Sequence, residues 1–156
     1  MKLNKKIINL LKRKKLKIAV AESCTGGMLS SIFTSINGSS KVFKLGLVAY
    51  SNESKIRVLN VSKKIINKYG AVSEQTCEAM AKNVAKMAKT NMSISVTGIA
   101  GPNGGTRKKP VGLVFIGIKK GSKIRVKKYL FKNKGRTSVQ KTSVNKSLKL
   151  TLSILK

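Results

Sequence analysis

The spacing of apolar and polar positions divides the chain into helices and strands. Between residues 3 and 11 the apolar side chains recur at helical spacing, and between residues 17 and 21 they form the short continuous run of a buried strand. From this spacing we predict helices at 3–14, 27–36, 53–59, 62–69, 74–89 and 136–155, and strands at 17–21, 42–50, 92–96, 111–118 and 123–131.

The order of these elements predicts the fold. Strands alternate with helices in the first two thirds of the chain, as in parallel sheets, whereas Gly121-Ser122 predicts a tight hairpin between the last two strands. We find no repeat and no linker in the sequence. We therefore expect residues 1–156 to form one domain, a three-layer α/β/α sandwich with a mixed, mostly parallel sheet of about five strands.

The chain is extremely basic, with 34 Lys and Arg against 4 acidic residues and a net charge of +30. This charge favours partners such as nucleic acid or a membrane surface. However, the lysines are spread over the whole chain, aromatic residues make up only 4%, and lysine far outnumbers arginine. We therefore expect non-specific binding to polyanions at low salt but no specific nucleic-acid partner.

The apolar segments predict neither a membrane span nor a signal peptide. No apolar run approaches the ~20 residues that cross a bilayer, and the basic stretch 1–15 is not followed by an uninterrupted apolar segment. Cys24 and Cys77 lie in different predicted elements, so we expect free thiols. These features predict a cytoplasmic protein with no membrane partner.

The absence of two residue types limits the possible chemistry. The sequence contains no histidine and no aspartate, and its four acidic residues are all glutamate. This excludes a catalytic triad with histidine and a metal site rich in histidine or carboxylates. Any enzyme built from this chain must use Lys, Tyr or Glu as the base, and Ser, Thr or Cys as the nucleophile.

The stretch 21–27, Ala-Glu-Ser-Cys-Thr-Gly-Gly, is the strongest candidate for a functional site. It joins a predicted buried strand to a predicted helix, so it lies at the open end of the sheet. The first N–H groups of a helix lack partners and carry partial positive charge, which favours anions. An ordinary strand-to-helix connection is the alternative interpretation.

Six segments, in the same order and spacing, resemble one family. They resemble the C-terminal domain of the competence-damage-inducible protein CinA, which also occurs alone as nicotinamide-mononucleotide amidohydrolase. The six segments are 21–27, Gly38-Ser39-Ser40 before Val42-Phe43, Ala49-Tyr50-Ser51-Asn52-Glu53-x-Lys55, Gly70-Ala71-Val72-Ser73-Glu74, Val96 to Thr106, and Lys109-Pro110-Val111-Gly112.

The resemblance implies hydrolysis of the carboxamide of nicotinamide mononucleotide to nicotinic acid mononucleotide and ammonia, in pyridine-nucleotide salvage. It implies a small-molecule nucleotide substrate, no cofactor, no metal and a homodimer. With histidine excluded, Ser23 becomes the nucleophile and Lys55 the base, with Tyr50 passing or orienting the proton. We expect the positive end of a short helix and the overall charge to lower the pKa of Lys55. Cys24 remains an alternative nucleophile.

The resemblance also implies a set of binding residues. Backbone N–H groups of the glycine turn would hold the oxyanion, the second glycine-rich loop and an arginine would hold the phosphate, and Glu22 would face the pyridinium or pair with a lysine. These residues are Glu22, Thr25, Gly26, Gly27, Thr97, Gly98, Gly101, Gly104, Gly105 and Arg136.

The sequence departs from the family pattern at the start of the last helix. Gly135 precedes Arg136, and Gln140 stands where the family has a second arginine, so we expect one anion contact to be missing. The larger metal-dependent domain of full-length CinA proteins is not represented, so we expect no pyrophosphatase activity. A nucleotide- or nucleic-acid-binding module without chemistry and a basic structural protein remain the alternatives.

Overall fold

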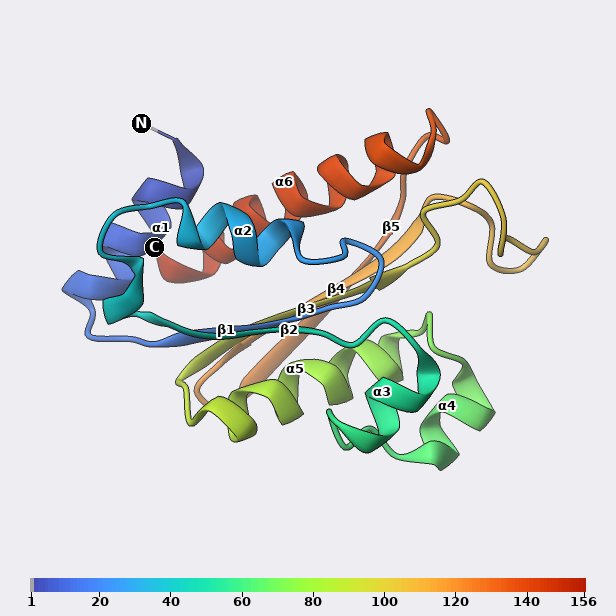
Figure 1. Cartoon of the computed structure of the whole chain (residues 1–156), viewed down its shortest axis with the longest axis horizontal. Coiled ribbons are helices and arrows are strands. Elements are labelled where there is room, and N and C mark those ends of the chain that lie inside the picture. The colour runs from blue at the N-terminus through green and yellow to red at the C-terminus, as the bar shows by residue number, and fades with distance from the viewer. Residues whose placement is uncertain (1) are drawn as a thin grey trace.

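Strands from both halves of the chain pair into a single sheet that is covered by helices on both faces (Figure 1). The computed structural model describes residues 2–156. The elements, in chain order, are α1 (Leu3–Arg13), β1 (Ile18–Glu22), α2 (Met28–Thr34), the 3₁₀ helix η1 (Ser39–Lys41), β2 (Phe43–Val48), α3 (Asn52–Arg57), α4 (Lys63–Tyr69), α5 (Glu74–Ala88), β3 (Met92–Gly98), β4 (Leu113–Lys120), β5 (Lys123–Leu130) and α6 (Arg136–Leu155).

The five strands form a mixed sheet in the order β2-β1-β3-β4-β5. β1 is parallel to both β2 and β3, whereas β4 is antiparallel to β3 and to β5. Four strands therefore run in one direction and β4 runs against them, which confirms the predicted mixed sheet. The hairpin is also confirmed, because Lys120 pairs with Lys123 across the Gly121-Ser122 turn.

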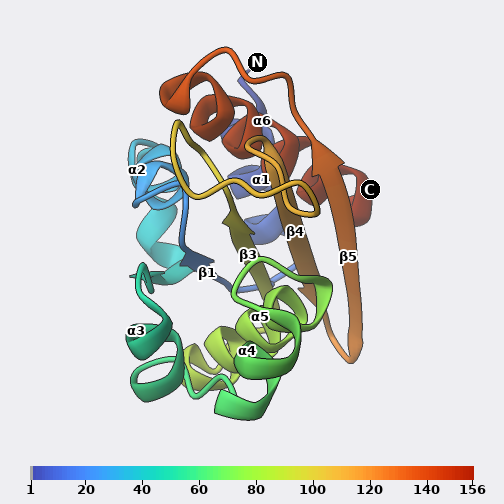
Figure 2. The same cartoon turned by 90° about the vertical axis from the view of Figure 1, so that its right-hand side faces the viewer.

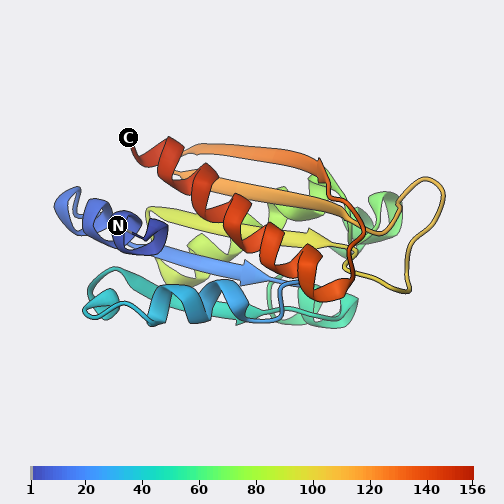
Figure 3. The ribbon, with the colours of Figure 1, turned by 90° about the horizontal axis from the view of Figure 1, so that it is seen from above.

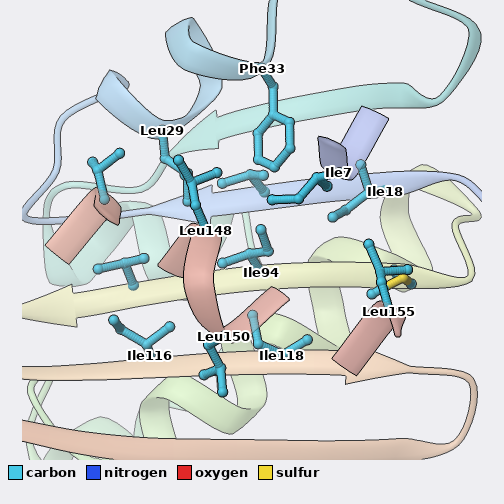
Figure 4. Packing of buried hydrophobic residues seen from close by; sticks show 14 of the residues in the cluster. Ile7, Ile18, Leu29, Phe33, Ile94, Ile116, Ile118, Leu148, Leu150 and Leu155 are labelled. Atoms are coloured by element: carbon cyan, nitrogen blue, oxygen red, sulfur yellow. The ribbon is translucent and has the colours of Figure 1, made fainter. Parts of the chain in front are cut away.

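The helices lie in two layers (Figures 1 and 2). α1, α2 and α6 cover one face, and α6 crosses the sheet diagonally when that face is viewed from above (Figure 3). α3, α4 and α5 cover the other face. The larger core lies under α1, α2 and α6, where fully buried side chains from helices and strands interdigitate (Figure 4). They include Ile7, Leu29, Phe33, Ile94 and Ile116.

Most of the predicted element ends differ from the structure by one or two residues, and the structure adds one short helix. β2 ends at Val48 rather than at residue 50, because the Tyr50 carbonyl accepts a hydrogen bond from a lysine side chain instead of from a strand. β4 begins at Leu113 rather than at residue 111, because Gly112, with φ 97°, turns the chain back onto the loop. η1 was not predicted, since Gly38-Ser39-Ser40 indicated only a turn.

The edge strand β5 exposes Lys123, Arg125, Lys127 and Lys128, as its alternating pattern predicted, and such charges discourage pairing with another strand.

Over residues 2–156 one ion pair is formed, between Arg57 and Glu53 at 3.1 Å on the surface of α3. None of the helices in this range combines the length and apolar character that a membrane span requires.

Candidate active site

Backbone hydrogen bonds fix the turn after β1 at the carboxyl end of the sheet. The Ser23 N–H donates to the Val96 carbonyl of β3 at 3.0 Å, and the Gly26 N–H donates to the Ser23 carbonyl at 3.1 Å. β1 has β2 on one side and β3 on the other, so Ser23 lies where the strand order reverses. Crevices at such positions are the usual ligand sites of open α/β sheets.

The start of α3 is fixed by a reciprocal pair of serine hydrogen bonds. The Ser51 hydroxyl accepts from the Ser54 N–H at 3.0 Å, and the Ser54 hydroxyl accepts from the Ser51 N–H at 3.1 Å. Ser51 is therefore the N-cap residue of α3. Its consequence for the site is that Lys55, one turn later, points inward and is only 1% exposed.

The structure brings Ser23 and Lys55 together from segments 32 residues apart. The Lys55 Nζ donates to the Ser23 Oγ at 2.9 Å, to the Ala49 carbonyl at 2.9 Å and to the Tyr50 carbonyl at 3.3 Å. All three partners are neutral oxygens, and none is a carboxylate, whose negative charge would stabilise the ammonium form more strongly. A buried hydroxyl in hydrogen-bond contact with a buried amine is the arrangement that a serine–lysine nucleophile requires.

Burial lowers the pKa of the Lys55 amine from 10.5 to about 8. Removing an ammonium group from water disfavours its charged form, so the neutral amine becomes accessible near physiological pH. The direction agrees with the expectation from sequence, but the cause is different. Desolvation is the dominant cause, rather than the helix end and the overall charge that the sequence suggested.

Cys24 lies beside the site but is chemically unsuited to be the nucleophile. Its side chain is 5% exposed and packs in the larger core, and burial raises the pKa of the thiol to about 12. At neutral pH the sulfur therefore carries its proton, and a thiol attacks far less readily than a thiolate. Of the two candidates that the sequence left open, the geometry and the protonation state favour Ser23.

A pocket of about 300 Å³ opens next to Ser23 and Lys55. Its lining, all of it within the described part of the chain, includes two cationic side chains, Lys55 and Arg136, and no acidic one. The pocket therefore favours an anionic ligand. The residues that line it are Ser23, Cys24, Tyr50, Asn52, Lys55, Ala71, Val72, Thr97, Gly98, Ile99, Ala100, Gly101, Asn103, Gly104 and Arg136.

Tyr50 and Arg136 bridge three segments at the rim of this pocket. The Arg136 guanidinium donates to the Gly101 carbonyl and to the Tyr50 hydroxyl, both at 2.9 Å. The Tyr50 hydroxyl thus contacts Arg136, whereas only its backbone carbonyl contacts Lys55. The expected role of the Tyr50 phenol in passing the proton of Ser23 is therefore not what the structure shows; the backbone of Tyr50 orients the amine instead.

The assignment of Glu22 to substrate binding is wrong. Its side chain is fully buried and accepts hydrogen bonds from the Thr25 hydroxyl at 2.7 Å, the Leu29 N–H at 2.8 Å, and the N–H and hydroxyl of Ser30 at 2.9 and 2.7 Å. The carboxylate thus satisfies free N–H groups at the beginning of α2. It also fixes the turn that carries Ser23, without lining the pocket.

Four further predicted binding residues lie outside the pocket lining. The Thr25 hydroxyl is used by Glu22, the Gly26 N–H by the Ser23 carbonyl, and Gly27 forms the N-cap of α2 with φ 98°. Gly105 packs against Val111, whose backbone nitrogen would lie 2.8 Å from an added Cβ. These glycines shape the chain around the site, and the pocket gives no support to the expected oxyanion role of residues 25–27.

The carboxyl end of β3 contributes Thr97 and Gly98 to the pocket lining. The Thr97 hydroxyl donates to the Ala71 carbonyl at 2.8 Å, which ties β3 to the segment before α5. At Gly98 an added Cβ would lie 2.8 Å from the Leu113 carbonyl, so only glycine fits there. Gly101 and Gly104, with φ 78° and 87°, turn the loop over the pocket.

The sequence did not identify Asn52 and Asn103 as individual site residues, although both line the pocket. Each lies in a segment that carried the family resemblance, and this location in the sequence was the one feature that could have marked it as a site residue. Gln140, expected only to lack an anion contact, has a structural role: its Nε2 donates to the Cys24 carbonyl at 2.9 Å. It thereby ties α6 to the turn that carries Ser23.

The described residues contain no group of three His, Cys, Asp or Glu side chains close enough to hold a metal ion. The polar groups of the candidate site are two aliphatic hydroxyls, a phenol, a thiol, an amine, a guanidinium, two asparagine amides and backbone groups. Such a set suits nucleophilic attack on an anionic substrate.

Comparison with known proteins relates the whole chain to one group. Residues 1–155 match the family model described as the CinA C-terminal domain. A putative competence-damage inducible protein of Thermoanaerobacter pseudethanolicus is 51% identical over 124 residues, covering 80% of this chain and 30% of that protein. A CinA-like protein of Prochlorococcus marinus is 48% identical over 151 residues, covering 94% of this chain and 36% of that protein.

Solved structures agree with this relationship. The crystal structure of the competence/damage inducible protein CihA from Agrobacterium tumefaciens superimposes with a TM-score of 0.96 at 35% identity, covering 99% of this chain and 94% of that chain. The CinA superfamily protein from Enterobacter cloacae gives a TM-score of 0.95 at 33% identity, covering 99% and 90%. The chain spans only about a third of the length of the curated relatives that it matches.

Proposed function

The chain belongs to the CinA C-terminal domain family, and we propose that it is an amidase that hydrolyses the carboxamide of nicotinamide mononucleotide. The observation that carries the proposal is the 2.9 Å contact between the buried Lys55 amine and the Ser23 hydroxyl, at the base of an acid-free pocket. The products are nicotinic acid mononucleotide and ammonia. We assign the reaction to pyridine-nucleotide salvage in the cytoplasm.

Ser23 and Lys55 together supply every proton transfer that the reaction needs. The neutral Lys55 amine takes the proton of the Ser23 hydroxyl while the Ser23 Oγ attacks the carboxamide carbon. Lys55 then gives that proton to the departing nitrogen, which leaves as ammonia, and an ester remains on Ser23. In the second half Lys55 takes a proton from water, hydroxide attacks the ester carbon, and Ser23 recovers its proton as the carboxylic acid is released.

The charges around the pocket match the two ends of this substrate. Two of the five N–H groups of the Arg136 guanidinium contact neutral oxygens, which leaves donors for a phosphate. Tyr50, 61% exposed and the aromatic member of the lining, offers a ring face to the pyridinium cation. The carboxamide then lies toward Ser23, and Asn103 and Gly104 lie beside the phosphate.

Release of ammonia from nicotinamide mononucleotide tests the proposal. We expect turnover by the unchanged chain, unaffected by a metal chelator, and a loss of at least about 1,000-fold in Ser23→Ala and in Lys55→Met. Ser31→Ala, an exposed serine on α2, is the matched control and should retain full activity. Saturable binding without product would show a binding module instead, and unchanged turnover in Ser23→Ala would exclude Ser23 as the nucleophile.

The proposal also covers partners. We expect a homodimer, by resemblance to the family, and no specific nucleic-acid partner. Sedimentation equilibrium at several protein concentrations tests the first point. Loss of nucleic-acid binding between about 50 and 200 mM salt, equally for any sequence, tests the second.

A further inference from the structure

A groove on the layer formed by α1, α2 and α6 lies apart from the candidate active site and has apolar walls. Its volume is about 480 Å³, and its apolar lining consists of Leu3, Met28, Ile32, Val144 and Leu148. Met28 and Ile32 are one helical turn apart on α2, as are Val144 and Leu148 on α6, so two rows of side chains face the groove. Leu3, at the beginning of α1, also lines the groove. Figure 3 shows the three helices from this side.

The surface around the groove is exclusively basic in its side-chain charges. Of the four acidic residues in the chain, Glu22 is buried, Glu53 belongs to α3, and Glu74 and Glu78 belong to α5, which covers the opposite face of the sheet (Figure 1). The exposed cationic side chains on or beside α1 and α6 include Lys2, Lys5, Lys6, Arg13, Lys14, Lys15, Lys141, Lys146 and Lys149.

We infer that this groove, lined by Leu3, Met28, Ile32, Val144 and Leu148 and rimmed by Lys2 and Lys141, binds an acidic amphipathic helix of a partner protein. An amphipathic helix places apolar anchors at i, i+3, i+4 and i+7 into such a groove, and flanking carboxylates would face the lysines. Methionine in the wall adapts to different anchor shapes. The surface thus combines an apolar strip with charge complementary to an acidic partner.

The same observations argue against other occupants. A second copy of this chain would bring another net charge of +30 to a face that has no exposed acidic side chain. Nucleic acid would leave the apolar walls uncovered, and none of the lining residues is an aromatic on which bases stack. A membrane surface requires protruding apolar side chains, whereas Val144 and Leu148 are recessed, at 3% and 6% exposure.

The test uses the full chain and fluorescein-labelled peptides of about 18 residues, measured by fluorescence anisotropy at 150 and 300 mM NaCl. The probe has leucines at i, i+3, i+4 and i+7 and glutamates on the flanking positions. A scrambled peptide of identical composition forms no apolar face and is the control. We expect the probe to bind at least 10-fold more tightly than the scrambled peptide at both salt concentrations.

Two pairs of variants locate the binding site. Ile32→Glu introduces a charge into the apolar wall, and Val58→Glu, at an exposed position beside α3, is its control. The double variant Lys2→Glu/Lys141→Glu reverses the charge of the groove rim without altering the core. Its control is the double variant Lys64→Glu/Lys86→Glu, which changes the net charge of the chain by the same amount on the opposite helical layer. We expect each groove variant to weaken the probe at least 10-fold and each control to leave it within about 2-fold.

Three results would overturn the inference. Equal affinity for the probe and the scrambled peptide, or equal weakening by the groove and control charge reversals, would show general polyanion binding only. Self-association that Ile32→Glu abolishes would show that the groove joins two copies of this chain. If the chain bound vesicles containing anionic lipid more tightly than the probe, and Ile32→Glu abolished that binding, the groove would be a membrane-binding surface.

Discussion

Raising the pH from 6 to 9 should increase the rate of amide hydrolysis, because it deprotonates the Lys55 ammonium group to the neutral amine. With a pKa of about 8 instead of 10.5, roughly one amine in ten is neutral at pH 7, which is ~300-fold more than for an ordinary lysine. We therefore expect kcat/KM to rise about 10-fold per pH unit up to pH 7, to reach half its maximum near pH 8, and to level off above pH 9.

The assay is ammonia release from nicotinamide mononucleotide at each pH, at substrate concentrations well below KM. The unfolding midpoint is measured in the same buffers, so that loss of the fold is separated from loss of the base. Cys24→Ala is measured in parallel and should leave the profile unchanged, because burial raises the pKa of the thiol to about 12 and the thiol keeps its proton throughout this pH range. A profile that is flat from pH 6 to 9, or that keeps rising toward pH 10.5, would refute the assignment of a desolvated Lys55 as the base.

Four further predictions concern individual side chains. As the pH rises from 8 to 10.5, the unfolding free energy of the native chain should increase by up to about 3 kcal/mol relative to that of Lys55→Met. In this pH range Lys55 is protonated in the unfolded chain but neutral in the folded one, so a rise in pH favours the folded state. Urea titrations at several pH values measure the difference. Glu22→Gln should lower the unfolding free energy by about 2–4 kcal/mol, against at most about 0.5 kcal/mol for Glu53→Gln in the exposed ion pair, in the same denaturation assay. Arg136→Ala should raise KM for the mononucleotide about 10- to 100-fold and leave KM for the riboside, which has no phosphate, within about 3-fold. Cys24→Ala should keep kcat within about 3-fold of the unchanged chain, and a loss comparable with that of Ser23→Ala would restore the thiol as nucleophile.

The fold could be predicted because the local pattern and the global arrangement agree. Residues 18–21 are all apolar and lie in the strand Ile18–Glu22, which is buried on both faces, whereas residues 123–130 alternate and form an edge. The chain next to the boundaries at Val48 and Leu113 is held by hydrogen bonds to other segments, from the Ala49 N–H to the Glu22 carbonyl and from the Ile99 N–H to the Leu113 carbonyl. No local pattern contains that information.

The candidate site was predictable where chemistry limited the choice. The lack of histidine and aspartate narrowed the candidate nucleophiles and bases, the family resemblance pointed to Ser23 and Lys55, and the structure places these two side chains in contact. The role of Glu22 was not predictable in the same way. A lone carboxylate next to a nucleophile suggested substrate binding, but the turn directs it to the beginning of α2.

The cause of the low pKa of Lys55 also lay outside the sequence. A lysine on a short helix in a chain with 34 basic residues gives no sign that it is 1% exposed. Burial results from the packing of α3 against the end of the sheet, which brings the Ala49 and Tyr50 carbonyls to the amine.

One helix, α6, connects features that otherwise lie apart. Arg136 at its first turn reaches the pocket, Gln140 holds the Cys24 carbonyl, and Val144 and Leu148 form a wall of the groove. Because each helical residue turns the side chains by about 100°, deleting a single residue between Gln140 and Val144 would rotate everything that follows away from its present neighbours. The helical geometry of α6 therefore fixes the relative orientation of Arg136, of Gln140 at the turn that carries Ser23, and of the groove wall. An insertion in α6 between any two of these features would rotate one of them away from its neighbours.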